Sequence, residues 1–368
     1  MSAPPSRPLS RRLFLGGALA GIGVSALAAC GSGGGAPATA AGSGGDGASA
    51  AELRLGYFAT VTHAVPLAMW GSGTAQRHLG DTRLSEQVFT AGPTAIESLL
   101  AGALDAAYLG PSPAINAHIQ TRGRALRVVS GAAQNGAAFV VRDGITGPED
   151  LRGKVFATPQ LGGTQDVALR TYLVEHGLTT DTTGGDDVTI VAQANAQTLD
   201  LFRSGDIDGA WLPEPWVSRL VLDAGATVLV DEKELWPNQA FPTTLLVVSQ
   251  EYLDAYPATV RALLEAHVET VGTIEADRPA AIELVNGEIA RHVGAPLEDA
   301  VMERAFGEVK LGWDPLASAM TQLGQDAVTA GIAQQAPDLT GLLDLTILDE
   351  VLSAAGESAV DDGGLGPA

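Results

Sequence analysis

Apolar and polar positions alternate with two different periods along the central part of the chain. Short apolar runs such as 52–58 and 126–133 have the length and composition of buried strands. A longer run over 65–80 repeats its apolar residues at helical spacing, with Pro66 in the first turn and Gly80 just past the end. Strands and helices therefore alternate here, which predicts a largely parallel sheet with helices on both faces.

A second series of the same kind follows the first. Its strands are expected at 137–143, 154–159, 187–193 and 209–212, and its helices at 164–177 and 196–204. A further strand is expected at 243–250, and from 252 to 355 the pattern is mostly helical, with breaks at Pro257, Gly294, Pro315 and Gly331. About three hundred residues of this kind suit two lobes better than one core.

Two short stretches repeat one another at a fixed offset. GDIDGAWLPEPW (205–216) aligns without a gap on GALDAAYLGPSP (102–113), and each follows a helix-like run. We call this repeat the echo. Each copy therefore supplies a helix, a glycine stop, a short apolar strand and a proline-rich corner. Ligands of open α/β sheets bind outside the carboxyl ends of strands, so two such lobes facing each other would place both corners in one cleft.

The N-terminus has the pattern of an export signal. SRRLFLGG contains a twin arginine and precedes a short apolar run that ends in LAAC at Cys30. LAAC has the form of a lipobox, in which the cysteine is lipidated and becomes the new N-terminus. We expect residues 1–29 to be a signal peptide of a lipoprotein, with Cys30 as the lipidation site. Cys30 is the single cysteine of the chain, so no internal disulfide is expected.

The segments that flank the expected lobes are poor in apolar side chains. Residues 30–51 are rich in Gly, Ala and Ser and predict a flexible tether. Residues 356–368 are again linker-like, which predicts a disordered tail.

The net charge is strongly negative and excludes one class of partner. The formal charge of -22 becomes -25 without residues 1–29, because Arg7, Arg11 and Arg12 leave and no acidic residue leaves. A basic patch for nucleic acid is therefore not expected. A small anionic ligand is still compatible with this charge, since local backbone dipoles can outweigh distant, screened charges.

The motifs together resemble a known family. LRLGYF…THAVPLAM, AGPTAIESLLAGALDAAYLGPSPAI, DLRGKVFATPQLGGTQDVALRTYL and LFRSGDIDGAWLPEPW resemble, in order, the substrate-binding proteins of ABC importers for sulfonates, taurine, nitrate and related anions. The likeness spans about 53–248 and is greatest to the aliphatic-sulfonate branch. It implies an extracytoplasmic monomer that captures a small solute and passes it to a membrane permease and, through it, an ATPase.

The resemblance also implies a fold and its boundaries. It implies the α/β, type II periplasmic-binding-protein fold, in which two lobes with mixed sheets surround a ligand cleft and are joined by a two-stranded hinge, with C-terminal helices added. The crossovers are placed by analogy near 136–140 and 238–244. Lobe 1 then comprises 52–137 and 242–355, and lobe 2 comprises 138–241.

Four segments are expected to bring helix N-termini and polar side chains to the cleft. Ser112 is expected to be an N-cap before Pro113, and the glycines of LGGTQD to let the backbone approach an oxyanion, with Thr164 as a cap. Glu214 is awkward for an anion site: it could face the permease, neutralise a cationic group such as that of taurine, or bind a hinge amide. The ligand-binding residues expected are Thr62, His63, Ser112, Gly163, Thr164, Gln165, Glu214 and Trp216.

The charge of the ligand is left open by the sequence. The three lysines of the body of the chain (residues 52–355), Lys154, Lys233 and Lys310, lie outside the cleft segments. Arg142 or Arg203 could reach the cleft from the lobe edges. Nitrate, bicarbonate, taurine or a neutral heterocycle such as a pyrimidine are therefore alternatives to a sulfonate.

Catalytic chemistry is not indicated. The six histidines are scattered without metal-ligand spacing, no nucleophile elbow occurs, and the only thiol is assigned to the lipid. We expect no catalytic residue, no metal and no cofactor. A biosynthetic enzyme on the same fold and a purely structural lipoprotein are the less favoured alternatives.

Overall fold

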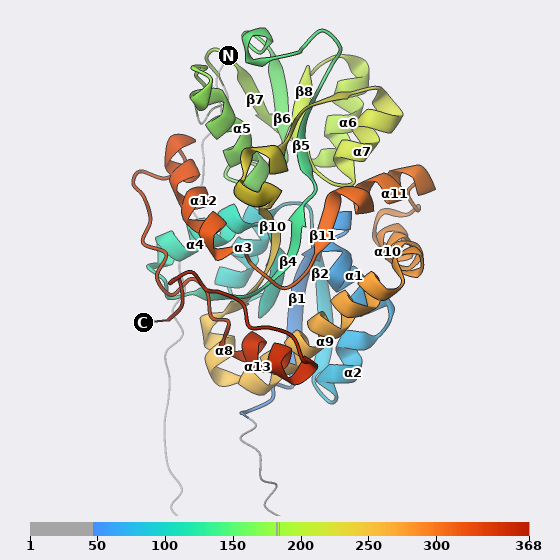
Figure 1. Ribbon diagram of the computed structural model, residues 1–368, viewed down its shortest axis with the longest axis vertical. Helices are drawn as coiled ribbons and strands as arrows, with labels where there is room; N and C mark the ends of the chain where they lie inside the picture. Colours follow the sequence, from blue (N-terminus) through green and yellow to red (C-terminus); the bar gives the residue numbers. More distant parts are fainter. Residues whose placement is uncertain (1–46, 182, 184, 368) are drawn as a thin grey trace, which may run out of the picture. The chain divides into compact units, whose positions relative to one another are not determined.

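The computed structural model describes residues 47–181, 183 and 185–367, so the predicted signal peptide and Cys30 lie outside the described residues. The described chain is organised around two sheets (Figure 1). Among these residues, no helix combines the length and apolar character needed to cross a membrane.

The first sheet has six strands in the order β11-β4-β10-β3-β1-β2. Their bounds are β1 Glu52–Phe58, β2 Arg83–Phe89, β3 Ala106–Leu109, β4 Leu126–Asn135, β10 Pro242–Ser249 and β11 Val309–Leu311. β1 pairs in parallel with β2 and β3, whereas β10 runs antiparallel to β3 and β4. The helices in sequence before the first crossover are α1 Ala64–Gly71, α2 Thr74–Leu79, α3 Gly92–Leu100 and α4 Pro111–Thr121.

The second sheet has five strands in the order β7-β6-β8-β5-β9. Their bounds are β5 Ala137–Val141, β6 Val155–Thr158, β7 Thr189–Ala192, β8 Gly209–Pro213 and β9 Thr227–Asp231, and the helices in this part are α5 Thr164–Glu175, α6 Asn195–Ser204 and α7 Trp216–Ala224. β6 is parallel to β7 and β8, and β5 is antiparallel to β8 and β9. The predicted α/β class with two mixed sheets is therefore confirmed.

The chain changes sheet twice. It leaves the first sheet at Asn135, turns at Gly136 with a φ of 71° that favours glycine, and enters the second at Ala137. It returns between β9 and β10 through the short 3-10 helices η3 Glu232–Leu235 and η4 Pro237–Gln239.

The C-terminal helices pack against both halves of the molecule. They are α8 Gln250–Ala255, α9 Pro257–Ala276, α10 Arg278–Val293, α11 Asp299–Glu308, α12 Ala317–Thr329 and α13 Thr346–Ala355. α9 packs on α1, α2 and α13, whereas α11 reaches α7 and α12 contacts both α4 and α5. α11 and α12 therefore bridge elements that belong to different sheets.

The repeated sequence has the same structural role in both halves. The Asp105 carboxylate accepts the backbone N–H of Arg54 at 2.8 Å, and the Asp208 carboxylate accepts that of Val155 at 2.9 Å. In return, the N–H of each aspartate donates to the carbonyl of the same partner. The echo thus ties the strand that it starts to a neighbouring parallel strand in each sheet.

Three details differ from the sequence prediction. The single helix expected at 65–80 is two helices, because Gly73 adopts a φ of 71° that ends α1 and precedes α2. Strands β9 and β11 and helix α7 were not predicted. The tail, predicted to be disordered, instead packs: Gly341 and Leu343 donate to the carbonyls of Gly366 and Leu365, because Val360 and Leu365 find apolar neighbours in the core.

The hydrogen bond from the Arg54 backbone N–H to Asp105 is expected to contribute to stability. Asp105→Ala removes the acceptor of the Arg54 backbone N–H and should lower the free energy of unfolding by about 1–3 kcal/mol. Asp81→Ala, at an exposed position of the same half, should change it by less than about 0.5 kcal/mol. Urea denaturation measures both, and an equal effect of the two substitutions would contradict this role for Asp105.

Candidate ligand-binding site

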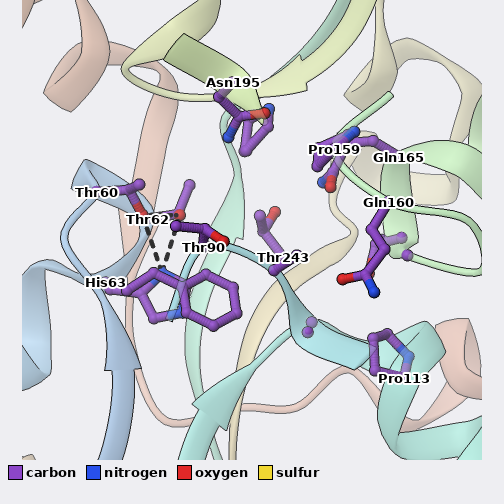
Figure 2. A pocket seen from close by; sticks show the side chains of 17 residues that line it. Thr60, Thr62, His63, Thr90, Pro113, Pro159, Gln160, Gln165, Asn195 and Thr243 are labelled. Atoms are coloured by element: carbon purple, nitrogen blue, oxygen red, sulfur yellow. Dashed lines mark hydrogen bonds between the residues drawn. The ribbon is translucent and has the colours of Figure 1, made fainter. Parts of the chain in front are cut away.

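A cavity lies between the two sheets, and residues from both line it (Figure 2). The side of the first sheet contributes Phe58, Thr60, Thr62, His63, Thr90, Ala91, Gly92, Gly110, Pro113 and Thr243, and that of the second contributes Pro159, Gln160, Gly163, Thr164, Gln165, Asn195 and Pro213. The volume of the cavity is about 50 Å³. Since one water molecule occupies roughly 10–15 Å³ of such a cavity, it suits a ligand of few atoms.

The carboxyl ends of the parallel strands deliver these residues. β1 ends at Phe58, β2 just before Thr90 and β3 just before Gly110. In the other sheet, β6 ends just before Pro159 and β8 ends at Pro213. Both corners of the echo therefore reach the cavity, through Gly110 and Pro113 in one copy and Pro213 in the other.

Five helices begin at this cavity. They are α1, α3, α4, α5 and α6, and their N-cap residues are His63, Ala91, Gly110, Gly163 and Ala194, none of which accepts a first-turn N–H with its side chain. Helices elsewhere also begin without such a cap, but here five helix N-termini share one cavity. Each carries about half a positive charge, so the cavity favours an anion.

Several donors at these N-termini have no partner. Among the described residues, no acceptor is found for the backbone N–H of Gly92, Ser112, Thr164, Gln165 and Asn195. The buried side-chain atoms Ser112 Oγ, Thr164 Oγ1, His63 Nε2 and Asn195 Oδ1 are also unpaired. Buried polar groups are nearly always hydrogen-bonded, so this concentration indicates a place for a polar ligand.

The cavity has no charged side chain among the described residues that line it. His63 is buried, its Nδ1 lies 3.1 Å from Thr60 Oγ1 and 3.2 Å from Thr62 Oγ1, and burial lowers its pKa to about 3. The imidazole is therefore neutral at physiological pH. Recognition would rest on backbone amides, hydroxyl groups, amides of Gln and Asn side chains and a neutral imidazole.

Thr164 is brought close to the opposite sheet by a glycine. A Cβ at Gly110 would lie 2.4 Å from Thr164 Oγ1, so only glycine allows this approach without a shift. The loop before Thr164 is fixed from behind by Asp166, whose carboxylate accepts from the Gly162 N–H, the Thr158 hydroxyl and Arg170 Nε at 2.9–3.0 Å. The Asp166–Arg170 pair is almost fully buried, so it holds the start of α5 rigidly.

Five of the eight residues predicted for the site line the cavity: Thr62, His63, Gly163, Thr164 and Gln165. Ser112 does not line it and is not an N-cap; it lies in the first turn of α4, where Gly110 is the N-cap. Thr164 is likewise the first residue of α5 rather than its cap, which is Gly163. The hydroxyl groups of both are thus left free of helix capping.

Glu214 and Trp216 lie outside the cavity. Glu214 is buried, accepts the Ser218 N–H at 3.0 Å in the first turn of α7 and pairs with Arg304 of α11 at 2.9 Å. Trp216 begins α7, and its ring carries the guanidinium of Arg219 at 4.8 Å. Both therefore fix α7 rather than a ligand.

The arginines proposed from the sequence are also engaged elsewhere. Arg142 donates to the carbonyls of Ile207 and Phe202, and Arg203 lies near Asp223. Residues missed by the sequence analysis include Thr60, Thr90, Gln160, Asn195 and Thr243. Four of these lie one to three residues after a strand end, so applying the strand-end rule to every strand would have found them. Thr243 lies in a crossover strand and gives no such signal.

The buried neutral state of His63 predicts a pH effect. The unfolded chain protonates this histidine near pH 6.5 and the folded chain near pH 3, so the unfolded state binds more protons in between and stability falls as the pH falls. From pH 7 to pH 5 this amounts to roughly 2 kcal/mol. Urea denaturation of wild type and His63→Gln at both pH values should show this additional loss in the wild type only; equal losses would contradict a buried, neutral His63.

The chain is similar to known proteins in family and in fold. The model of the NMT1-like family matches residues 46–287. The taurine-binding periplasmic protein of Escherichia coli (strain K12) is 27% identical over 184 residues, which are 49% of this chain and 54% of that protein. The chain thus spans about half the length of the curated relatives that it matches.

Two solved structures show the fold of this chain. The alkanesulfonate-binding protein SsuA of Xanthomonas axonopodis pv. citri, bound to MOPS, has a TM-score of 0.66 at 23% identity, covering 79% of this chain and 96% of that one. The periplasmic nitrate-binding protein NrtA of Synechocystis PCC 6803 has a TM-score of 0.65 at 16% identity, covering 83% and 89%. At these identities the likeness is one of fold.

Proposed function

The chain belongs to the NMT1-like family, and on that premise we propose that it is the solute-binding component of an ABC importer. It captures a small sulfonate-like anion in the cavity between the two sheets and delivers it to the permease and its ATPase. The observation that carries this proposal is the set of five helix N-termini around one small cavity, four of which, those of α3, α4, α5 and α6, have an unpaired first-turn N–H. Such N-termini bind oxyanions through backbone N–H groups.

The electrostatics of the lining rank the alternative ligands. Taurine carries an ammonium group, and no carboxylate lines the cavity among the described residues, since Glu214 is paired with Arg304. A neutral heterocycle gains less than an anion from five helix N-termini. Nitrate and bicarbonate have the required size and charge and are the main competitors of a small alkanesulfonate.

The cellular setting is part of the proposal. Export by the twin-arginine signal and a lipid on Cys30 would hold a monomer at the outer face of the membrane, and residues 30–51 would space it from the lipid. The lining contains His63 but no lysine, carboxylate or thiol among the described residues, so we propose binding without a covalent step and without a cofactor. A structural lipoprotein would show no saturable binding of a small anion.

A hydroxyl deletion tests the site. Thr164→Val keeps the shape of the side chain and removes a donor, which is worth about 1.5–3 kcal/mol when the acceptor is charged. Affinity for the ligand that binds best should therefore fall about 10- to 100-fold. Thr270→Val is a matched control, because Thr270 is also buried with an unpaired hydroxyl but lies in α9.

Isothermal titration with methanesulfonate, ethanesulfonate, taurine, nitrate, bicarbonate and uracil provides the measurement. We expect saturable binding of at least one small anion, weakened by Thr164→Val and unchanged by Thr270→Val. Binding of uracil alone would replace the anion by a neutral ligand. Silence for every compound, or an equal effect of the two substitutions, would contradict the proposed site.

A further inference from the structure

A second, larger cavity of about 580 Å³ lies away from the first. It is bounded by residues 167–175 of α5, by the crossover segment 232–240 and by residues 316–326, which belong mostly to α12, and it shares no lining residue with the first cavity. Its volume falls in the range of pockets that hold small organic molecules, about 300–1,000 Å³.

This cavity is lined by acidic groups and would therefore favour a cation, whereas the first cavity favours an anion. Three carboxylates line it, from Glu175, Glu232 and Asp326, and no Lys, Arg or His does so among the described residues. Glu232 is 1% exposed; its Oε2 accepts from the indole N–H of Trp211 at 2.6 Å, while its Oε1 is buried without a hydrogen-bond partner. A buried carboxylate oxygen without a partner is costly and needs a positive or donating group beside it.

Burial raises the pKa of the Glu232 carboxyl to about 8 and raises that of Asp326. A positive charge placed next to Glu232 would favour its ionised form, and the mutual stabilisation would favour binding of a cation. The neighbouring Lys233 does not supply this charge, because its ammonium group pairs with Asp231 at 2.7 Å.

The remaining walls are apolar and aromatic. Tyr172 of α5 and Trp236 of the crossover contribute rings, and Leu235 and Leu323 contribute aliphatic surface. Leu235 is 50% exposed although it is a large apolar side chain. Aromatic faces attract organic cations as well as alkyl groups.

We propose that this cavity binds a small organic ammonium ion with a short alkyl group. The ammonium group lies between Glu232 and Asp326, and the alkyl group contacts Tyr172 and Trp236. This site is separate from the anion site and does not depend on the proposed transport function, since neither the residues nor the ligand charge are shared.

Titration calorimetry with n-butylammonium chloride tests this site on the whole folded body. We expect saturable 1:1 binding, at least 10-fold weaker in Asp326→Asn and at least 3-fold weaker in Trp236→Leu. Glu283→Gln is the matched control and should leave the affinity unchanged. Glu283 belongs to α10 and lines a different groove, which shares no residue with this cavity. 1-Butanol, which has the alkyl group without the charge, should not saturate.

Two kinds of result would contradict the ammonium site. Absence of saturable binding, or equal affinities in Asp326→Asn and Glu283→Gln, would overturn the ammonium site. Competition between n-butylammonium and methanesulfonate for one site would place the cation in the first cavity and would also overturn it. Because Asp326 is partly exposed and makes its side-chain bond to Gln322, Asp326→Asn is expected to fold, and circular dichroism checks this.

Discussion

The structure depends on a single constraint: the carboxyl ends of the parallel strands in both sheets open toward the same space. Five of the helices that follow these strands, α1, α3, α4, α5 and α6, then begin at that space, and in four of them a first-turn N–H is unpaired. In most proteins water or a side-chain oxygen would satisfy these donors. Here several lie beside buried, unpaired side-chain atoms such as Thr164 Oγ1, which favours a small polar ligand as their partner.

This arrangement is compatible with our proposal that a strongly acidic protein binds an anion. The formal charge of -22 is carried mostly by exposed residues and is screened over about 8–10 Å in salt. The first cavity has no charged lining residue among the described part of the chain, so the partial charges of the helix N-termini act there at short range. The buried acidic groups, Asp105, Asp166, Glu214 and Glu232, do not line this cavity, and each accepts a hydrogen bond from another part of the chain.

Much of the fold could be predicted from the sequence, because apolar periodicity and glycine breaks determine where most strands and helices lie. The echo was informative for a physical reason, since Asp105 and Asp208 make the same bond to a neighbouring strand. The echo was a less reliable guide to the ligand-binding residues. Trp216 and Glu214 follow the second corner directly, but the chain turns α7 away from the cavity, and the partner of Glu214 is Arg304, ninety residues further along. No local pattern reveals such a contact. Strands β9 and β11 were missed for a similar reason, since pairing with β5 and β4 defines them.

We propose that backbone N–H groups at the converging helix N-termini hold the anion. Amide ¹H–¹⁵N NMR spectra of the body, recorded during titration with methanesulfonate and then with nitrate, test it most directly. We expect saturable downfield shifts of the amide signals of Gly92, Ser112, Thr164, Gln165 and Asn195 with at least one of the two anions, and small shifts for amides in α9 and α13. Saturable shifts that spare all five of these amides would contradict it.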